Sequence, residues 1–154
     1  MAAELDRIDR HILNQLQKDN RISNQALAEL VGLSPPACLR RVRKLRNEGV
    51  IMADVSLIDP RIAGRYINII VEVEMIRDQL DMYDAFKRKM DAASEVTQCY
   101  QVTGEVDFLL VLMVEDMEAY ENFTRHYLST EPNLRKFRTL ISLRRDKFST
   151  ALPL

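Results

Sequence analysis

Residues 23–48 read SNQALAELVGLSPPACLRRVRKLRNE and contain the start and stop signals of two closely spaced helices. Ser23 can accept a hydrogen bond from an unpaired amide at a helix start, and Gly32 can take the left-handed conformation in which many helices end. Ser34 offers a second cap after one intervening residue. Pro35 then stands at the first helical position, where its missing N–H costs no hydrogen bond. We therefore predict a short helix that ends at Gly32 and a second one that starts at Pro35.

A supporting helix is predicted upstream of this pair, from Leu5 to about Lys18. Apolar residues recur there at steps of three and four, which is the spacing of an amphipathic helix. They are Leu5, Ile8, Ile12, Leu13 and Leu16. Two short helices joined by a glycine-containing turn and preceded by a supporting helix form a helix-turn-helix unit. We assign residues 1–52 to a helix-turn-helix DNA-binding domain.

The helix from Pro35 has two chemically different faces when its residues are placed at steps of about 100°. Cys38, Val42, Leu45 and Gly49 gather on an inward face. The outward face has small residues near its start, which permit close approach to the major groove, and Arg and Asn side chains that can bond base edges. A merely solvated charged face is the alternative, which the preceding turn disfavours. The residues expected to contact DNA are Ser23, Asn24, Ser34, Pro36, Ala37, Arg40, Arg41, Arg43, Lys44 and Asn47.

The net charge of −1 is unevenly distributed along the chain. Residues 1–52 hold nine Lys or Arg and six Asp or Glu, a net charge of +3, whereas residues 53–154 have a net charge of −4. Residues 34–48 alone hold five basic side chains and one acidic one. This basic segment can neutralise the phosphates of DNA.

Other function classes are disfavoured by the composition. No apolar run approaches the about 18 residues of a membrane span, and residues 1–10 carry charges where a signal peptide has an apolar core, so we expect a cytoplasmic protein with no membrane partner. The two cysteines and two histidines stand far apart, so we expect no metal site, disulfide or cofactor. Cys38 could be a redox sensor, but its place on the inward face favours a small core residue.

Residues 53–65 are predicted to form a linker, with a short strand over Val55 to Ile58 and a connector that contains Pro60 and Gly64. Beyond it, the hydrophobic pattern predicts the order strand, helix, strand, strand, helix, strand. The ranges are 66–75, 80–90, 96–102, 108–114, 117–128 and 134–143. This order is that of a ferredoxin-like βαββαβ domain, in which two helices cover one face of a four-stranded antiparallel sheet. We therefore expect an α+β protein whose second domain spans residues 66–154.

The predicted sheet has apolar residues on both faces. In its first strand Ile67, Ile69, Val71 and Val73 share one parity, while Ile70 lies on the other. The final strand likewise carries apolar residues of both parities. Because a second copy can remove an open apolar face from water, we predict a homodimer formed sheet to sheet.

The segment between the two middle strands, Val102 to Asp107, is the part of this domain best suited to bind a ligand. Gly104 permits the close approach of a ligand, and the carboxylates of Glu105 and Asp107 can bind an ammonium group or a neighbouring arginine. A plain hairpin turn with solvated acidic residues is the alternative, and the pattern alone favours that alternative.

Several stretches resemble the Lrp/AsnC family, the leucine-responsive and asparagine regulators that are also called feast/famine proteins. The stretches are Leu5 to Leu13, Arg21 to Asn24, Val31 to Pro35, Cys38-Leu39, Arg41 to Arg43, Leu45, and Val102 to Leu110. The resemblance spans almost the whole chain. It implies a winged helix-turn-helix domain that binds DNA, a linker strand, and a ferredoxin-like domain for effector binding and oligomerisation. In the family this domain forms dimers and often octamers, and it commonly binds an amino acid between dimers.

The resemblance also implies an effector site where the acidic loop meets the start of the last strand. By position, its candidate residues here are Gln101, Thr103, Gly104, Glu105, Asp107, Leu140, Ile141 and Ser142. Glu105 stands where a shorter aspartate is frequent in the family, so the effector of a known member cannot be transferred to this chain.

The leading hypothesis is a sequence-specific regulator of transcription that binds double-stranded DNA and responds to an amino acid or a related small metabolite. Sirohaem decarboxylases are similar to the family in both halves and provide an enzymatic alternative. Such an enzyme would need positioned histidines in a tetrapyrrole pocket, and this chain has only His11 and His126. A ligand-sensing assembly protein that has lost DNA binding is the third alternative, which the capped turn and the arginines disfavour.

Overall fold

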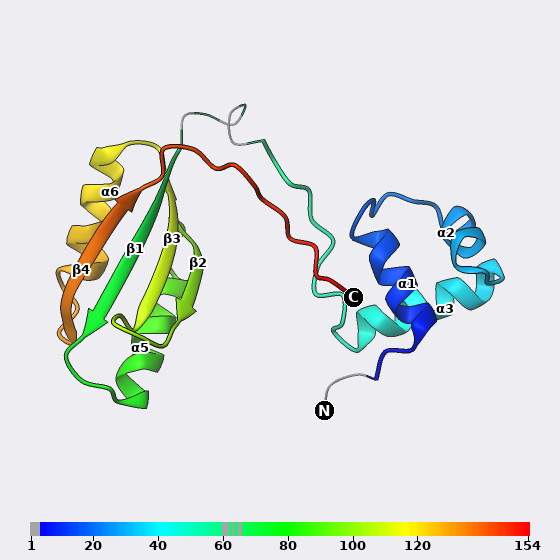
Figure 1. Cartoon of the computed structure of the whole chain (residues 1–154), viewed down its shortest axis with the longest axis horizontal. Coiled ribbons are helices and arrows are strands. Elements are labelled where there is room, and N and C mark those ends of the chain that lie inside the picture. The colour runs from blue at the N-terminus through cyan, green and yellow to red at the C-terminus, as the bar shows by residue number, and fades with distance from the viewer. Residues whose placement is uncertain (1–3, 60–61, 63, 65) are drawn as a thin grey trace. The chain divides into compact units, whose positions relative to one another are not determined.

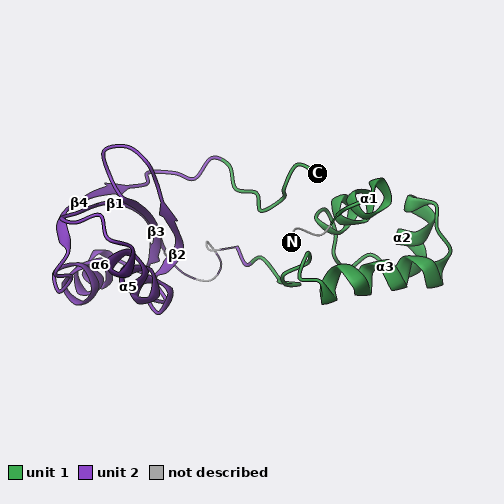
Figure 2. Cartoon of the chain, turned by 90° about the horizontal axis from the view of Figure 1, so that it is seen from below, with its two compact units in different colours: residues 1–57, 147–154 green, residues 58–146 purple. Residues whose placement is uncertain are grey.

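Three helices form the N-terminal part of the computed structural model, which describes residues 4–59, 62, 64 and 66–154. They are α1 (Arg7–Leu16), α2 (Asn24–Val31) and α3 (Pro35–Asn47) (Figure 1). The sequence predicted all three, and α1 is shorter at both ends than the predicted range of 5–18. The chain divides into two compact units, residues 1–57 with 147–154 and residues 58–146 (Figure 2).

Local hydrogen bonds explain where these helices begin and end. Asp6 caps α1 by accepting the Asp9 N–H at 2.8 Å, and the Asp9 side chain accepts the Asp6 N–H in return. Ser23 caps α2 as predicted, and Gly32 ends it in the left-handed conformation at φ 71°. Ser34 occupies the cap position of α3, but its side chain makes no capping hydrogen bond. The predicted position of the cap and of the proline after it is thus confirmed, whereas the predicted capping by the Ser34 hydroxyl is wrong.

The inward face of α3 completes the core of the first unit. Cys38, Val42 and Leu45 are buried together with residues of α1 and α2, as the helical spacing predicted. Gly49 does not share this face, because it is exposed beyond the end of α3 with φ 72°. Burial raises the pKa of the Cys38 thiol, which disfavours the thiolate that a redox sensor needs.

The segments that flank the second unit differ from the predicted boundaries. Residues 52–59 contain no strand, so the predicted linker strand over Val55 to Ile58 is wrong for the single chain. A strand needs a neighbouring strand to pair with, and none of the described strands pairs with Val55 to Ile58. Residues 60, 61, 63 and 65 of the predicted connector lie outside the described residues. The resemblance also implied a wing, but none of the described residues of the first unit forms a strand.

The C-terminal residues 147–154 belong to the first unit, whereas the predicted second domain ran to residue 154. Gln17, the C-cap residue of α1, pairs with the backbone of Leu152: its side chain donates to the Leu152 C=O at 3.1 Å and accepts the Leu152 N–H at 2.6 Å. Asn14 donates to the C=O of Leu154 at 3.1 Å. These hydrogen bonds hold residues 152–154 against the C-terminal end of α1.

The second unit has the predicted βαββαβ order. Its elements are β1 (Ile67–Met75), α5 (Leu80–Asp91), β2 (Val96–Gln101), β3 (Phe108–Val114), α6 (Met117–Phe123), a π-helical turn η1 (Thr124–Leu128) and β4 (Leu134–Ile141). The four strands form an antiparallel sheet in the order β2-β3-β1-β4. The helices α5 and α6 lie on the same face of this sheet (Figure 2).

Alternation along the strands separates a buried face from an open one. Side chains of β1 and β3 such as Val71 and Leu110 are fully buried against aromatic residues of α5 and α6, including Phe86 and Phe123. The intervening residue Ile70 points to the other face, in register with Val111 of β3 and with Leu140 of β4. The uncovered apolar face that the sequence predicted is therefore confirmed. None of the described helices is long and apolar enough to cross a membrane.

Candidate DNA-binding surface and effector region

The outward face of α3 is a cationic surface. Arg40, Arg43, Lys44 and Asn47 are exposed there, and with Pro36, Leu39 and Glu48 they line a shallow hollow. Arg40 and Arg43 form no ion pair with any residue that the structure describes. Lys44 lies 3.8 Å from Glu48, and both side chains are so exposed that the pair contributes little to stability. These side chains are therefore available to an external anion.

The remaining predicted DNA contacts lie around the turn between α2 and α3. The Ser23 hydroxyl is engaged as the α2 cap, and the Asn24 side chain donates to the C=O of Pro35 at 2.8 Å. This second bond joins the first residue of α2 to the first residue of α3. Ser34 and Pro36 are exposed, and Ala37 is half-buried. Ser23 and Asn24 thus already have bonds that hold the turn in shape.

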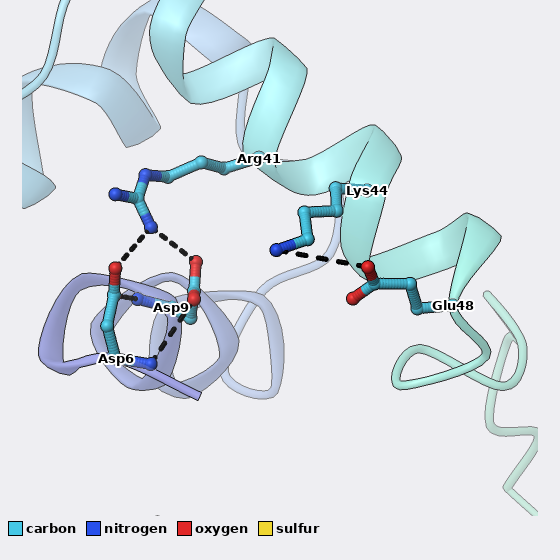
Figure 3. Close-up of polar contacts among 5 residues, drawn as sticks. All are labelled: Asp6, Asp9, Arg41, Lys44 and Glu48. Atoms are coloured by element: carbon cyan, nitrogen blue, oxygen red, sulfur yellow. Dashed lines mark hydrogen bonds and ion pairs between the residues drawn. The ribbon is translucent and has the colours of Figure 1, made fainter. Parts of the chain in front are cut away.

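Arg41 differs from the other arginines of α3, because its side chain turns toward α1. Its Nη1 donates to Asp6 at 2.6 Å and to Asp9 at 2.8 Å (Figure 3). The carboxylate of Asp6, followed by that of Asp9, raises the pKa of the guanidinium. The Asp9 backbone N–H, followed by Arg41, lowers the pKa of Asp6. The sequence placed Arg41 among the DNA contacts because it shows the basic run but not the two acids 32 and 35 residues away.

The acidic loop between β2 and β3 has a well-defined backbone. The N–H of Val102 donates to the C=O of Asp107 at 2.9 Å, and the N–H of Asp107 donates to the C=O of Val73 at 2.8 Å. Gly104 has φ 127°, a conformation that residues with a side chain rarely adopt. Gln101, Thr103, Gly104 and Glu105 are exposed at this end of the sheet. They are accessible to a ligand.

Both carboxylate oxygens of Asp107 already accept hydrogen bonds from within the chain. Its Oδ2 accepts the N–H of Met75 at 2.7 Å, and its Oδ1 accepts the Tyr83 hydroxyl in a very short hydrogen bond. Burial, and then the hydrogen bond to the Asp107 carboxylate, raises the pKa of Tyr83. The sequence did not single out Tyr83, because its spacing in α5 marks a core residue and gives no sign of the loop that it contacts. Asp107 therefore holds the loop in place, whereas Glu105 is the exposed acid.

The two predicted parts of the effector site lie at opposite ends of the sheet. The acidic loop adjoins the pair Val73 and Phe108, whereas Ile141 pairs with Ile69, and the Ser142 N–H donates to the C=O of Asn68. Figure 1 shows the β2–β3 loop at one end and the exit of β4 at the other. Leu140 and Ile141 are the last two residues of β4, and Ser142 follows them. These residues therefore lie at the end of the last strand and not at its start, which corrects the predicted placement. One copy of the chain does not bring the two parts together.

Two family models match the two halves of the chain. The model described as "Winged helix-turn-helix DNA-binding" matches residues 5–52, and the model described as "Lrp/AsnC ligand binding domain" matches residues 68–152. The second match covers more than half of the chain. The protein belongs to the Lrp/AsnC family. The resemblance that the sequence motifs indicated is confirmed by this match.

Relatives in the Lrp/AsnC family are similar over nearly their whole length. An uncharacterised HTH-type transcriptional regulator of Sinorhizobium fredii is 43% identical over 153 residues, which are 99% of this chain and 90% of the relative. The leucine-responsive regulatory protein of Escherichia coli is 38% identical over 149 residues, 97% of this chain and 91% of the relative. These names support a transcription regulator with a helix-turn-helix DNA-binding domain, and not the enzymatic alternative.

A solved structure of the family has the same fold. It is the crystal structure of a transcriptional regulator of Neisseria meningitidis as an L-Met complex, and it has a TM-score of 0.87 and 31% sequence identity. The similarity covers 97% of each chain. Both parts of the predicted fold class, the helix-turn-helix domain and the α+β domain with a four-stranded sheet, are thereby confirmed.

The buried Tyr83–Asp107 pair predicts a loss of stability at alkaline pH. An unfolded tyrosine ionises near pH 10, whereas the folded protein holds Tyr83 protonated above that pH because its pKa is raised. The stabilisation is thus complete below about pH 10 and is lost as the pH rises toward the pKa of the folded state. We expect Tyr83→Phe to reduce the fall of the unfolding free energy between pH 9 and pH 11, measured by urea denaturation. Tyr100→Phe, at an exposed site, is the control, and equal slopes in wild type and Tyr83→Phe would contradict the prediction.

Proposed function

We propose that α3 enters the major groove of an operator and that Arg40, Arg43 and Asn47 bond base edges there, with Lys44 at the phosphates. The observation that carries this proposal is the division of α3 between a buried side and a cationic side. Cys38, Val42 and Leu45 anchor the helix in the core, so its outward side chains project from a rigid support. A DNA-binding protein of this kind would work in the compartment that holds the DNA, which is the cytoplasm in the bacterial hosts of the relatives named above.

The open face of the sheet supports a homodimer. Ile70, Val111 and Leu140 form an apolar centre on this face, and Glu72 forms an ion pair with Arg138 at 2.5 Å beside it. A second copy that packs against this centre would remove it from water. Two copies of α3 would then read successive major grooves of a pseudo-palindromic site, about 34 Å apart. Dimers would associate further into a larger ring such as an octamer.

The effector of this proposal is an amino acid or a related small metabolite. The Neisseria meningitidis regulator, which was solved with L-Met, supports this chemistry. The exposed carboxylate of Glu105 can bind an ammonium group, and the backbone at Gly104 lets a ligand approach closely. Because residues 140–142 lie at the other end of the sheet, they would complete the site only from another copy. An effector held between copies would change the assembly and thereby the affinity for DNA.

The first test concerns base reading by α3. An operator is selected from random duplexes, and the affinity of wild type and Arg40→Ala is measured by fluorescence anisotropy. We expect Arg40→Ala to cost about 1–3 kcal/mol on the operator and to relax selectivity at one position. Arg125→Ala, an exposed arginine of η1 in the second unit, should bind like wild type. Equal affinity of the wild-type protein for the operator and for a random duplex would exclude a sequence-specific reader.

The second test concerns the open face of the sheet. Val111→Glu places a carboxylate at the apolar centre, where burial by a second copy would cost several kcal/mol. We expect sedimentation velocity to show a dimer or a larger assembly for wild type and a folded monomer for this variant. Leu80→Glu, on the helix layer at an 80% exposed position, should assemble normally. A variant Val111→Glu that still forms dimers would place the interface elsewhere.

The third test concerns the effector. Each of the twenty amino acids is added, and the shift in the melting temperature is measured. A ligand at 100 times its dissociation constant stabilises the folded state by about 2.7 kcal/mol, and Glu105→Gln should abolish this shift. No shift with any amino acid would remove the amino-acid effector from the proposal and leave DNA binding untouched.

A further inference from the structure

Arg41 is part of the basic run of α3, but its guanidinium does not face the DNA-binding surface. Its side chain is 31% exposed and extends to the N-terminus of α1, whereas its neighbour Arg40 is exposed on the outward face. A single nitrogen, Nη1, bridges the carboxylates of Asp6 and Asp9 (Figure 3). The side chain of Asp9 is only 11% exposed, so the Arg41–Asp9 contact is partly shielded from water, whereas the side chain of Asp6 is 50% exposed.

The two carboxylates that hold Arg41 are also the caps of α1. Asp6 uses Oδ1 for the Asp9 N–H and Oδ2 for Arg41, and Asp9 uses Oδ2 for the Asp6 N–H and Oδ1 for Arg41. All four carboxylate oxygens are therefore engaged in one network. The first turn of α1 and the second turn of α3 are joined through it.

This network fixes the rotation of α3 relative to α1, which the apolar core between the two helices does not. Ile12 of α1 and Cys38 and Val42 of α3 meet in the apolar core, and apolar contact has little directional preference. Charge-assisted hydrogen bonds at 2.6 and 2.8 Å are directional and strong. A rotation of α3 about its axis would break them before it exposed much apolar surface.

We propose that Arg41 is a positioning residue for DNA recognition: its bridge to Asp6 and Asp9 sets the rotation of α3, so that Arg40 and Arg43 point outward, and Arg41 itself contacts no phosphate. The inference rests on the proposed DNA contacts of α3. It also explains why acidic residues lie next to a DNA-binding helix. Their charge is matched by Arg41 and by the positive end of α1, which limits their repulsion of DNA.

A phosphate contact by Arg41 is the competing role, and the two roles predict opposite effects of the carboxylates. If Arg41 binds phosphate, Asp6 and Asp9 compete with DNA for it, and removal of an acid strengthens binding. If Arg41 positions α3, removal of an acid weakens recognition. Asp6→Asn separates the two, because asparagine also caps helices and keeps the bond to the Asp9 N–H.

The experiment compares wild type, Arg41→Gln, Asp6→Asn and the double variant on the selected operator and on a random duplex over a range of salt concentrations. We expect the ratio of the two affinities to fall about tenfold in Arg41→Gln and to fall in Asp6→Asn as well. The ratio of the two affinities in the double variant should be no lower than the ratio in Arg41→Gln. The dependence of log affinity on log salt should keep the wild-type slope. Lys44→Gln, which removes a proposed phosphate contact, should reduce that slope by about 0.9 and preserve the ratio.

Two outcomes would overturn the positioning role. The first is evidence that Arg41 contacts a phosphate. That evidence would be tighter DNA binding by Asp6→Asn, or a salt dependence of log affinity whose slope is reduced by about 0.9 in Arg41→Gln. The other is an equal loss of affinity for both duplexes in Arg41→Gln and Asp6→Asn, which is the signature of fewer folded molecules and not of misplaced side chains. Wild-type protein that does not distinguish the duplexes would instead defeat the proposed function, on which this inference rests.

Discussion

A four-stranded sheet with both of its helices on one face leaves a second face that no described helix of the same unit covers. In this protein that face has an apolar centre at Ile70, Val111 and Leu140, flanked by cross-strand ion pairs. Apolar surface of this kind is a driving force for association. A homodimer would provide two readers, and two readers suit an operator with two half-sites. The one-sided cover of the sheet thus underlies both the assembly and the geometry of DNA binding that we propose.

The same constraint bears on the effector site. The acidic loop and residues 140–142 lie at opposite ends of one sheet, so a site that uses both must draw them from different copies. Ligand binding and assembly would then be the same event, which links an effector to DNA affinity without a long path through the protein. Asp107 contributes to such a site indirectly, because its carboxylate is bonded to Met75 and Tyr83 and keeps the loop in shape.

Helix α3 shows how the basic side chains of one short helix can be divided between two surroundings. Arg40, Arg43 and Lys44 remain available on the outward face, whereas Arg41 is neutralised by the carboxylates that cap α1. A basic run along a sequence therefore does not contribute all of its charges to one surface. Successive residues of a helix point in directions about 100° apart, and the neighbouring helix decides which of the basic side chains stays free.

Local signals in the sequence were sufficient to predict the helices and strands of both units and their order, although not the absence of a linker strand. Gly32, Pro35 and the Ser23 cap act within a few residues of themselves, and the alternation in β1 and the spacing of Cys38, Val42 and Leu45 follow from the periods of strand and helix. The family was also accessible, because its motifs are local stretches. Only the folded structure reveals where Arg41 and Asp107 direct their side chains, that Val55 to Ile58 pair with no described strand, and that the two effector segments lie apart. These features depend on residues more than 20 positions away and on the register between strands, and such contacts leave no periodic trace along the chain.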